Sequence, residues 1–219
     1  MTEFWQAFLP PGTERPAKWK ETYDAPMPDG SRLRLPLRDF TDFAVAGLIA
    51  NQASFAVVDA LSAWMAQAAR PFAPDIVVGL PTLGHVFGAG AARALGHPNW
   101  VAPGTSRKLW YDDSLSAPLV SITSPMAGRR MWLDPRLLPR LAGSRVLLVD
   151  DVISTGSSSL AGLALLDAAG ITPVALCVAM LQGNRWRTGW PASIPVVGAF
   201  ATPLFARNGD AWVEREGTT

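Results

Sequence analysis

Residues 144–158 read Ser-Arg-Val-Leu-Leu-Val-Asp-Asp-Val-Ile-Ser-Thr-Gly-Ser-Ser, and they indicate the architecture more clearly than any other part of the chain. The run 146–149 is apolar at every position, which is typical of a strand covered on both faces in a parallel sheet. Two acidic residues and a Ser/Thr/Gly loop follow. A helix is predicted from about 158 to 169, with Gly170 as its C-cap. The stretch therefore predicts a strand–loop–helix unit of an α/β protein.

Further strands and helices alternate along the rest of the chain. A short β-branched run at 75–79 precedes a small-residue helix at 86–95, and another buried strand is predicted at 172–181. This alternation indicates a mostly parallel twisted sheet flanked by helices, with right-handed crossovers. Residues 43–70 are predicted to form one or two helices that end at prolines.

We expect three parts in the chain. An N-terminal segment at 1–42 contains an alternating strand at 31–35, the α/β core spans 43–181, and a C-terminal lobe spans 182–219 with a strand pair around 194–205. The N-terminal segment, the C-terminal lobe or both could form a small hood over the core.

Composition restricts the class of protein. Of the 219 residues, 49% are hydrophobic and 17% are charged, against roughly 25% charged in a typical soluble domain. The net charge of +1 argues against nucleic acid as a partner. A single cysteine, Cys177, favours a reducing compartment, and the N-terminus has no secretory-signal pattern. Polar residues interrupt the apolar region 44–69, so no membrane span is predicted. We expect a cytoplasmic protein, and its apolar composition favours a homodimer.

The loop after the strand has the chemistry of an anion site. Consecutive backbone N–H groups between a strand and a helix, with the helix N-terminus, attract phosphate. The hydroxyl side chains add donors, and the glycine lets a phosphate approach the backbone. The two adjacent acids could accept hydrogen bonds from a sugar diol, directly or through Mg²⁺ and its waters. A phosphorylated sugar suits both halves of this site.

A purely structural interpretation of the loop is a helix N-cap preceded by a glycine turn. The loop is not a P-loop, because the Gly-Lys-Ser/Thr ending is missing. It also lacks the Gly-x-Gly-x-x-Gly dinucleotide fingerprint.

Residues 149–158 resemble the phosphoribosyl-pyrophosphate (PRPP) binding motif of the type I phosphoribosyltransferases. The wider layout, from about residue 23 to 181, is similar to the adenine phosphoribosyltransferases of the purine phosphoribosyltransferase family. The resemblance implies the type I fold, with Asp150 and Asp151 holding the ribose hydroxyls and Mg²⁺. It implies that the 5′-phosphate binds in the loop of Ser154, Thr155, Gly156, Ser157 and Ser158.

Two further stretches fit the family layout. The family's pyrophosphate loop corresponds here to Pro81, Thr82, Leu83, Gly84 and His85. Arg107 and Lys108 match the Arg-Lys pair in the family's mobile lid, here 104–130, which would exclude water. The resemblance thus implies four catalytic residues, in which these two cations stabilise the leaving pyrophosphate and the two aspartates hold the ribose. Arg129 and Arg130 at the end of the lid could reach phosphate or face solvent.

The acceptor half of the site departs from the adenine pattern. Pro81 and Leu83 stand where the adenine enzymes carry Glu and Arg, and Ser154 stands where the hypoxanthine/guanine enzymes carry an acid. By position in the family layout, Leu33 and Trp186 are the candidates for contacting the base. The indole of Trp186 would offer a flat stacking face.

The resemblance predicts transfer of the 5-phosphoribosyl group from PRPP to a nitrogen of a nucleobase, expected to be a purine, with release of pyrophosphate in nucleotide salvage. Positioning and charge stabilisation would accelerate a reaction with an oxocarbenium-like transition state, without a protein nucleophile. Two alternatives remain open, a PRPP-sensing regulatory protein without turnover and a transferase whose acceptor is not a purine. The family also implies a homodimer.

Overall fold

The computed structural model describes residues 3–119 and 129–219. Its α-helices are α1 (Phe55–Ala69), α2 (Gly84–Leu95), α3 (Leu138–Leu141) and α4 (Ser157–Ala168). Its strands are β1 (Phe8–Leu9), β2 (Thr22–Pro26), β3 (Arg32–Asp39), β4 (Ala44–Ala46), β5 (Ile76–Gly79), β6 (Ser116–Pro118), β7 (Arg130–Trp132), β8 (Val146–Ile153), β9 (Ala175–Gln182), β10 (Val196–Thr202), β11 (Leu204–Asn208) and β12 (Ala211–Glu214). Short 3₁₀ helices lie at Ala50–Gln52, Arg70–Phe72, Pro135–Leu137 and Arg185–Thr188.

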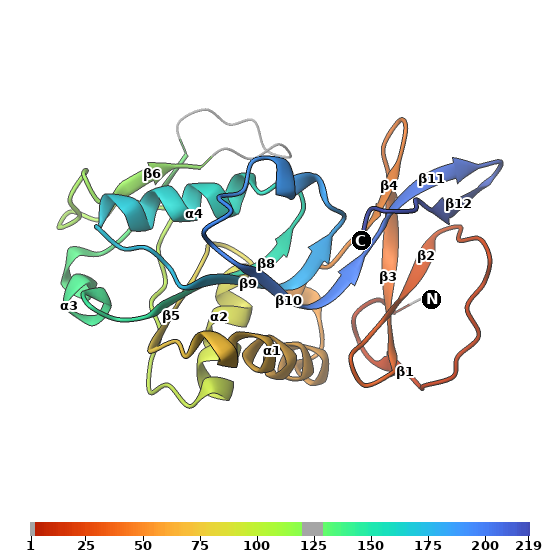
Figure 1. Cartoon of the computed structure of the whole chain (residues 1–219), viewed down its shortest axis with the longest axis horizontal. Helices are drawn as coiled ribbons and strands as arrows, with labels where there is room; N and C mark the ends of the chain where they lie inside the picture. The colour runs from red at the N-terminus through yellow and green to blue at the C-terminus, as the bar shows by residue number, and fades with distance from the viewer. Residues whose placement is uncertain (1–2, 120–128) are drawn as a thin grey trace.

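Parallel strands in the order β10-β9-β8-β5 form the core sheet. Val146 of β8 pairs with Ile76 of β5, and Leu147 of β8 pairs with Ala175 of β9. Helices α1 and α2 cover one face of this sheet and α4 covers the other (Figure 1). Helices on both faces explain why β8 and β9 are apolar and buried along most of their length. The α/β architecture predicted from the sequence is confirmed.

A second, antiparallel sheet lies beside the core and is built from both ends of the chain (Figure 1). Its strands run in the order β1-β3-β4-β11-β12, and β2 pairs with β3. The strand predicted at 31–35 is the first part of β3. Two segments far apart in sequence join where Leu204 of β11 pairs with Val45 of β4.

The core sheet extends beyond the boundary expected at residue 181. Strand β10 lies within the segment expected to form a C-terminal lobe, yet it pairs in parallel with β9, with Val196 opposite Leu176. Only β11 and β12 of that segment belong to the second sheet. The expected division at 182 is therefore wrong for β10, because its apolar residues complete the core sheet instead of pairing in a local hairpin.

The region 43–70 is not helical throughout. Its first residues form β4, which is fully buried, and α1 begins only at Phe55. The side chain of Ser54 caps this helix by accepting a hydrogen bond from the backbone N–H of Val57. A short apolar run does not by itself distinguish a buried strand from a buried helix, and here pairing with β3 and β11 makes it a strand.

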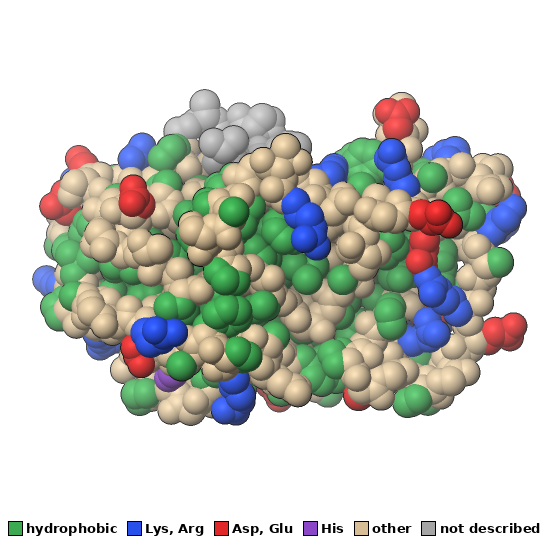
Figure 2. Space-filling model, in the orientation of Figure 1, with side chains coloured by type: hydrophobic (Ala, Val, Ile, Leu, Met, Phe, Trp, Pro, Cys, Tyr) green, Lys and Arg blue, Asp and Glu red, His purple; other side chains and the backbone are tan. Residues whose placement is uncertain are grey.

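The parallel arrangement brings the carboxyl ends of β5, β8 and β9 to one edge of the core sheet, where ligands bind in folds of this type. Figure 2 shows charged side chains of both signs close together over the second sheet, whereas hydrophobic side chains are visible over the core. Within the described residues, no helix has the length and apolar character needed to cross a membrane.

Candidate active site

Asp150 and Asp151 lie near the carboxyl end of β8. Asp150 is only 4% exposed, and its Oδ1 accepts a hydrogen bond from the backbone N–H of Asp151 at 3.0 Å. The Ser159 hydroxyl donates to its Oδ2 at 3.4 Å. Burial raises the pKa of Asp150 well above its ordinary value, and the charge of Asp151 raises it further. Burial also raises the pKa of Asp151. A buried carboxyl group beside a partly buried one is costly without a cation, so this pair is suited to a ligand that donates to it.

The N-terminus of α2 packs directly against Asp150. A Cβ atom at Gly84 would lie 2.8 Å from Asp150 Oδ1 and 3.0 Å from its Cα, so only glycine fits this position. Gly84 belongs to the predicted pyrophosphate loop, in which the peptide bond between Pro81 and Thr82 is cis. This loop therefore borders the acidic pair.

His85 is the second residue of α2. Its Nε2 lies 2.9 Å from the carbonyl oxygen of Pro103, and its ring packs edge-on against Trp100. Burial lowers the pKa of His85 below its ordinary value. The contact between His85 and Pro103 links the pyrophosphate loop to the segment that carries Arg107.

The loop that is predicted to bind the 5′-phosphate, residues 154–158, is here called the phosphate loop. It follows β8 and leads into α4. Gly156 has φ of +87°, a left-handed conformation that glycine adopts without a Cβ penalty. The hydroxyls of Thr155 and Ser157 lie 3.0 Å apart, and α4 begins at Ser157. The loop thus collects hydroxyl groups at the N-terminus of a helix, which is the arrangement that binds phosphate.

A cavity of about 410 Å³ joins this loop to the second sheet. Residues 154–159 form one side of it, and Phe40, Phe43 and Val45 form another. The rings of Phe40 and Phe43 stack with centroids 4.9 Å apart. Donors for a phosphate and aromatic faces for a flat ring therefore line a single cavity.

Arg185 connects the two sides of this cavity. Its Nη2 donates to the Ser154 hydroxyl at 2.8 Å, and its guanidinium carbon lies 4.9 Å from the centroid of the Phe43 ring. Arg38, Val152 and Gln182 also line the cavity. Sequence reasoning missed these wall residues. The Phe40-x-x-Phe43 spacing was the available signal, but residues from 43 onward were expected to be helical.

Neither predicted base contact, Leu33 or Trp186, lines this cavity. Leu33 is fully buried in the core that the second sheet shares with α1, and Trp186 is buried in the core on the α4 side at 7% exposure. The Trp186 indole N–H donates to the carbonyl oxygen of Gly183 at 3.1 Å. Both side chains are in contact with the core, which leaves no free face for a base.

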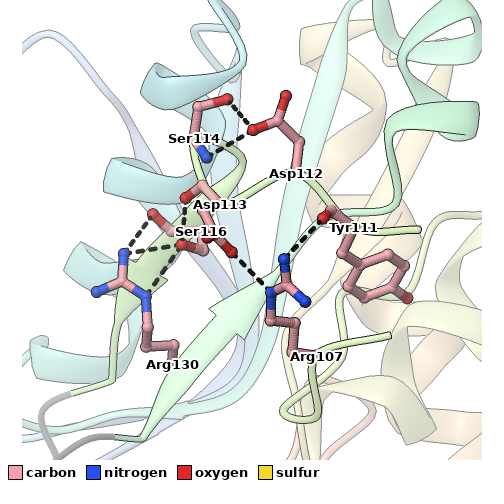
Figure 3. Close-up of polar contacts among 7 residues, drawn as sticks. All are labelled: Arg107, Tyr111, Asp112, Asp113, Ser114, Ser116 and Arg130. Carbon is pink, nitrogen blue, oxygen red and sulfur yellow. Dashed lines mark hydrogen bonds and ion pairs between the residues drawn. The ribbon is translucent and has the colours of Figure 1, made fainter. Parts of the chain in front are cut away.

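Arg107 and Lys108 lie exposed in the segment before β6. The Arg107 Nε donates to Asp113 Oδ1 at 2.7 Å (Figure 3). Its guanidinium also lies over the ring of Trp132, 5.7 Å from the centroid. Arg130 is held on the neighbouring strand, where its Nη2 donates to the Ser116 hydroxyl at 2.8 Å (Figure 3). Of the expected lid at 104–130, residues 120–128 lie outside the described residues.

The acidic pair is a reasonable partner for Mg²⁺ only if the substrate also supplies ligands. Among residues 3–119 and 129–219, no group of three or more His, Cys, Asp or Glu side chains could enclose a metal ion. Mg²⁺ is usually bound by one or two carboxylates together with water and substrate phosphates. Asp150 and Asp151 match that donor set.

Comparisons with known proteins agree on one family. The phosphoribosyl transferase domain model matches residues 45–189. An adenine phosphoribosyltransferase of Methylococcus capsulatus is 30% identical over 156 residues, which cover 69% of this chain and 86% of that protein. An adenine phosphoribosyltransferase of Kineococcus radiotolerans is 31% identical over 179 residues, covering 74% of this chain and 91% of that protein. The crystal structure of the APRTase of Giardia lamblia complexed with 9-deazaadenine superimposes with a TM-score of 0.55 and 21% identity, covering 67% of this chain and 80% of that one.

Proposed function

Because this chain belongs to the phosphoribosyl transferase domain family, we propose that it transfers the 5-phosphoribosyl group of PRPP to a ring nitrogen of a purine base and releases pyrophosphate. Family membership confirms the type I phosphoribosyltransferase predicted from residues 149–158, and with it the enzyme class. Adenine is the first base to consider, because the curated relatives are named for it.

One observation carries this proposal. The phosphate loop and the stacked rings of Phe40 and Phe43 line the same cavity. A nucleoside monophosphate has a dianion at one end and a flat base at the other, and this cavity supplies donors for the first and aromatic faces for the second. In this arrangement the second sheet serves as the hood, and strands from both ends of the chain build it.

Asp150 and Asp151 are proposed to accept hydrogen bonds from the ribose hydroxyls. Their negative charge would also favour the positive charge that develops on the ribose as the bond to pyrophosphate breaks. Mg²⁺, held by these two carboxylates and the substrate, would neutralise the charge of the pyrophosphate group. Arg107 and Lys108 are proposed to approach the same leaving group, which requires Arg107 to exchange its exposed ion pair with Asp113 for phosphate. An exposed pair of this kind is weak, so the exchange is inexpensive.

The cytoplasm is the proposed location, and a homodimer is the proposed assembly. Exposed large apolar side chains support the dimer, since Phe55 is 88% exposed and Leu109 is 95% exposed. Burial of such surface between two copies would remove it from water.

Pyrophosphate release tests the function directly. The protein is incubated with PRPP, Mg²⁺ and one base at a time from adenine, hypoxanthine, guanine, xanthine, uracil and orotate. We expect release with at least one purine and none in the Asp150→Ala/Asp151→Ala double variant. Release only with uracil or orotate would replace the purine by another acceptor. PRPP binding without release for any base would replace the enzyme by a sensor.

Substitutions in the phosphate loop should weaken the binding of PRPP and leave the binding of the base unchanged. Replacing Thr155 or Ser157 with Ala removes one hydroxyl donor to the 5′-phosphate. We expect the KM for PRPP to rise by about 10-fold in each case, as for loss of one hydrogen bond to a charged group. The KM for the base should stay within about 2-fold of wild type, since the base is proposed to bind against the aromatic rings and not against these hydroxyls. Steady-state kinetics measure both constants, and Thr188→Val, which alters an exposed residue outside the cavity, is the matched control. An unchanged KM for PRPP would place the 5′-phosphate elsewhere.

A further inference from the structure

Gln182 is a buried polar residue in the wall of the cavity. It is the last residue of β9 and is 7% exposed. It lines the same cavity as Phe43 and Ser154. A buried amide must satisfy a donor group and an acceptor group, so its partners define what it offers to a ligand.

The orientation of the Gln182 amide is fixed by the second sheet. Its Nε2 donates to the backbone carbonyl oxygen of Ala46 in β4 at 2.7 Å. A carbonyl oxygen can only accept, so the atom facing Ala46 must be the NH₂ nitrogen, and the opposite assignment would bring two oxygens together. The side-chain oxygen Oε1 therefore points away from Ala46. Within the part of the chain that the structure describes, no group donates a hydrogen bond to this oxygen. The oxygen is also not sealed from solvent. It is accessible, and the cavity is the space that Gln182 borders.

We propose that Gln182 is a specificity-determining residue, whose Oε1 accepts a hydrogen bond from the exocyclic amino group of a 6-aminopurine. This inference rests on the proposed function, because it assigns the side chain that recognises the base in the same cavity. A 6-oxopurine bound in the same orientation would direct its carbonyl oxygen at Oε1, so that two acceptors would face each other. A site that is built to pair one substrate group discriminates strongly against an analogue that leaves that group unpaired.

Arg185, which lines the same cavity, has the complementary character. The Arg185 guanidinium has donors only, and it is joined to the Ser154 hydroxyl at 2.8 Å. The ring nitrogens of adenine on either side of its amino group are acceptors. One acceptor at Gln182 and donors at Arg185 therefore match the alternation of groups along the edge of adenine.

The Gln182 amide also ties β9 to β4, so a variant can fail for a structural reason. The ratio of kcat/KM for adenine to kcat/KM for hypoxanthine separates the two roles, because a loosened fold lowers both values together. In Gln182→Leu we expect this ratio to fall by about 100-fold, with the KM for PRPP within about 2-fold of wild type. In Gln182→Lys the ammonium can still donate to Ala46, and it presents a donor to the cavity. We expect this variant to favour hypoxanthine over adenine.

Gln67→Leu is the matched control, since Gln67 lies on the exposed face of α1 outside the cavity and the same substitution there should leave the ratio unchanged. Calorimetric binding of AMP and IMP to the same variants reports the preference without turnover. Equal losses for both bases in Gln182→Leu, or an unchanged preference in both variants, would overturn the inference while the transferase function stands. Absence of pyrophosphate release from the wild-type protein with every purine would instead overturn the proposed function and this inference with it.

Discussion

Asp151→Asn is expected to reduce kcat/KM for PRPP by about 1000-fold without unfolding the protein. The substitution exchanges one carboxylate oxygen for an amide that donates, so the group can no longer accept a ribose hydroxyl through both of its atoms. It also removes a negative charge from the place where positive charge develops on the ribose. Initial rates of pyrophosphate release measure the loss, and circular dichroism checks the fold. A variant with wild-type rates would show that Asp151 has no part in binding the ribose.

The neighbouring Asp150→Asn substitution is expected to stabilise the ligand-free protein at pH 7. Burial and the charge of Asp151 raise the pKa of Asp150 in the folded protein above its ordinary value. The stability that Asp150 contributes is therefore present below its unfolded pKa of 3.8 and is lost as pH rises through the folded pKa. At pH 7 the ligand-free Asn variant should melt at a higher temperature than wild type, and the difference should shrink as pH falls toward 4. A lower melting temperature at pH 7 would contradict this assignment.

Gly84→Ala should damage both folding and activity. The added methyl group would lie 2.8 Å from Asp150 Oδ1, 3.0 Å from Asp150 Cα and 3.1 Å from the carbonyl oxygen of Val149. Two of these atoms belong to the backbone of the central strand β8, which cannot move aside as a flexible side chain can. We expect a loss of about 2 kcal/mol in the free energy of unfolding. We also expect a fall of about 100-fold in kcat/KM for PRPP, because the displaced atoms carry the acidic pair.

Urea denaturation and initial rates measure these two effects of Gly84→Ala. Gly189→Ala is the matched control, since a methyl group there meets no atom within 4 Å and its backbone is not left-handed. Wild-type stability in Gly84→Ala would mean that α2 can shift away from β8, and the close approach of α2 would then not be needed to shape the site.

Strand β8, the phosphate loop and the first turn of α4 could be predicted from the sequence because their determinants are local. Four apolar residues, two acids and a glycine specify them in order, and α4 begins within one residue of the expected position. The first helical residues of α2 were missed, since the expected helix began at residue 86. Gly84 and His85 look like loop residues in sequence, and only packing against β8 shows that the helix already includes them.

The aromatic wall of the cavity could not be predicted because it depends on pairing between distant segments. Phe40 and Phe43 lie between β3 and β4, and β4 is held by β11 from the other end of the chain. No local pattern reports that contact. Trp186 was expected to contact the base because of its position in the sequence. In the structure its indole is buried beside Gly156. The exposure of an aromatic ring is a property of the packed molecule.

The pairing of β4 with β11 also bears on how the newly made protein acquires its shape. A ribosome releases the chain from its N-terminus, so β4 must keep one edge unpaired until Leu204–Asn208 has emerged. The parallel strand β10 is equally late. An open strand edge is prone to pair with another chain, which makes the unfinished nascent protein vulnerable to aggregation. Val45, which lines the cavity, lies in β4 opposite Leu204, so this part of the cavity wall lacks its strand partner until synthesis has passed β11.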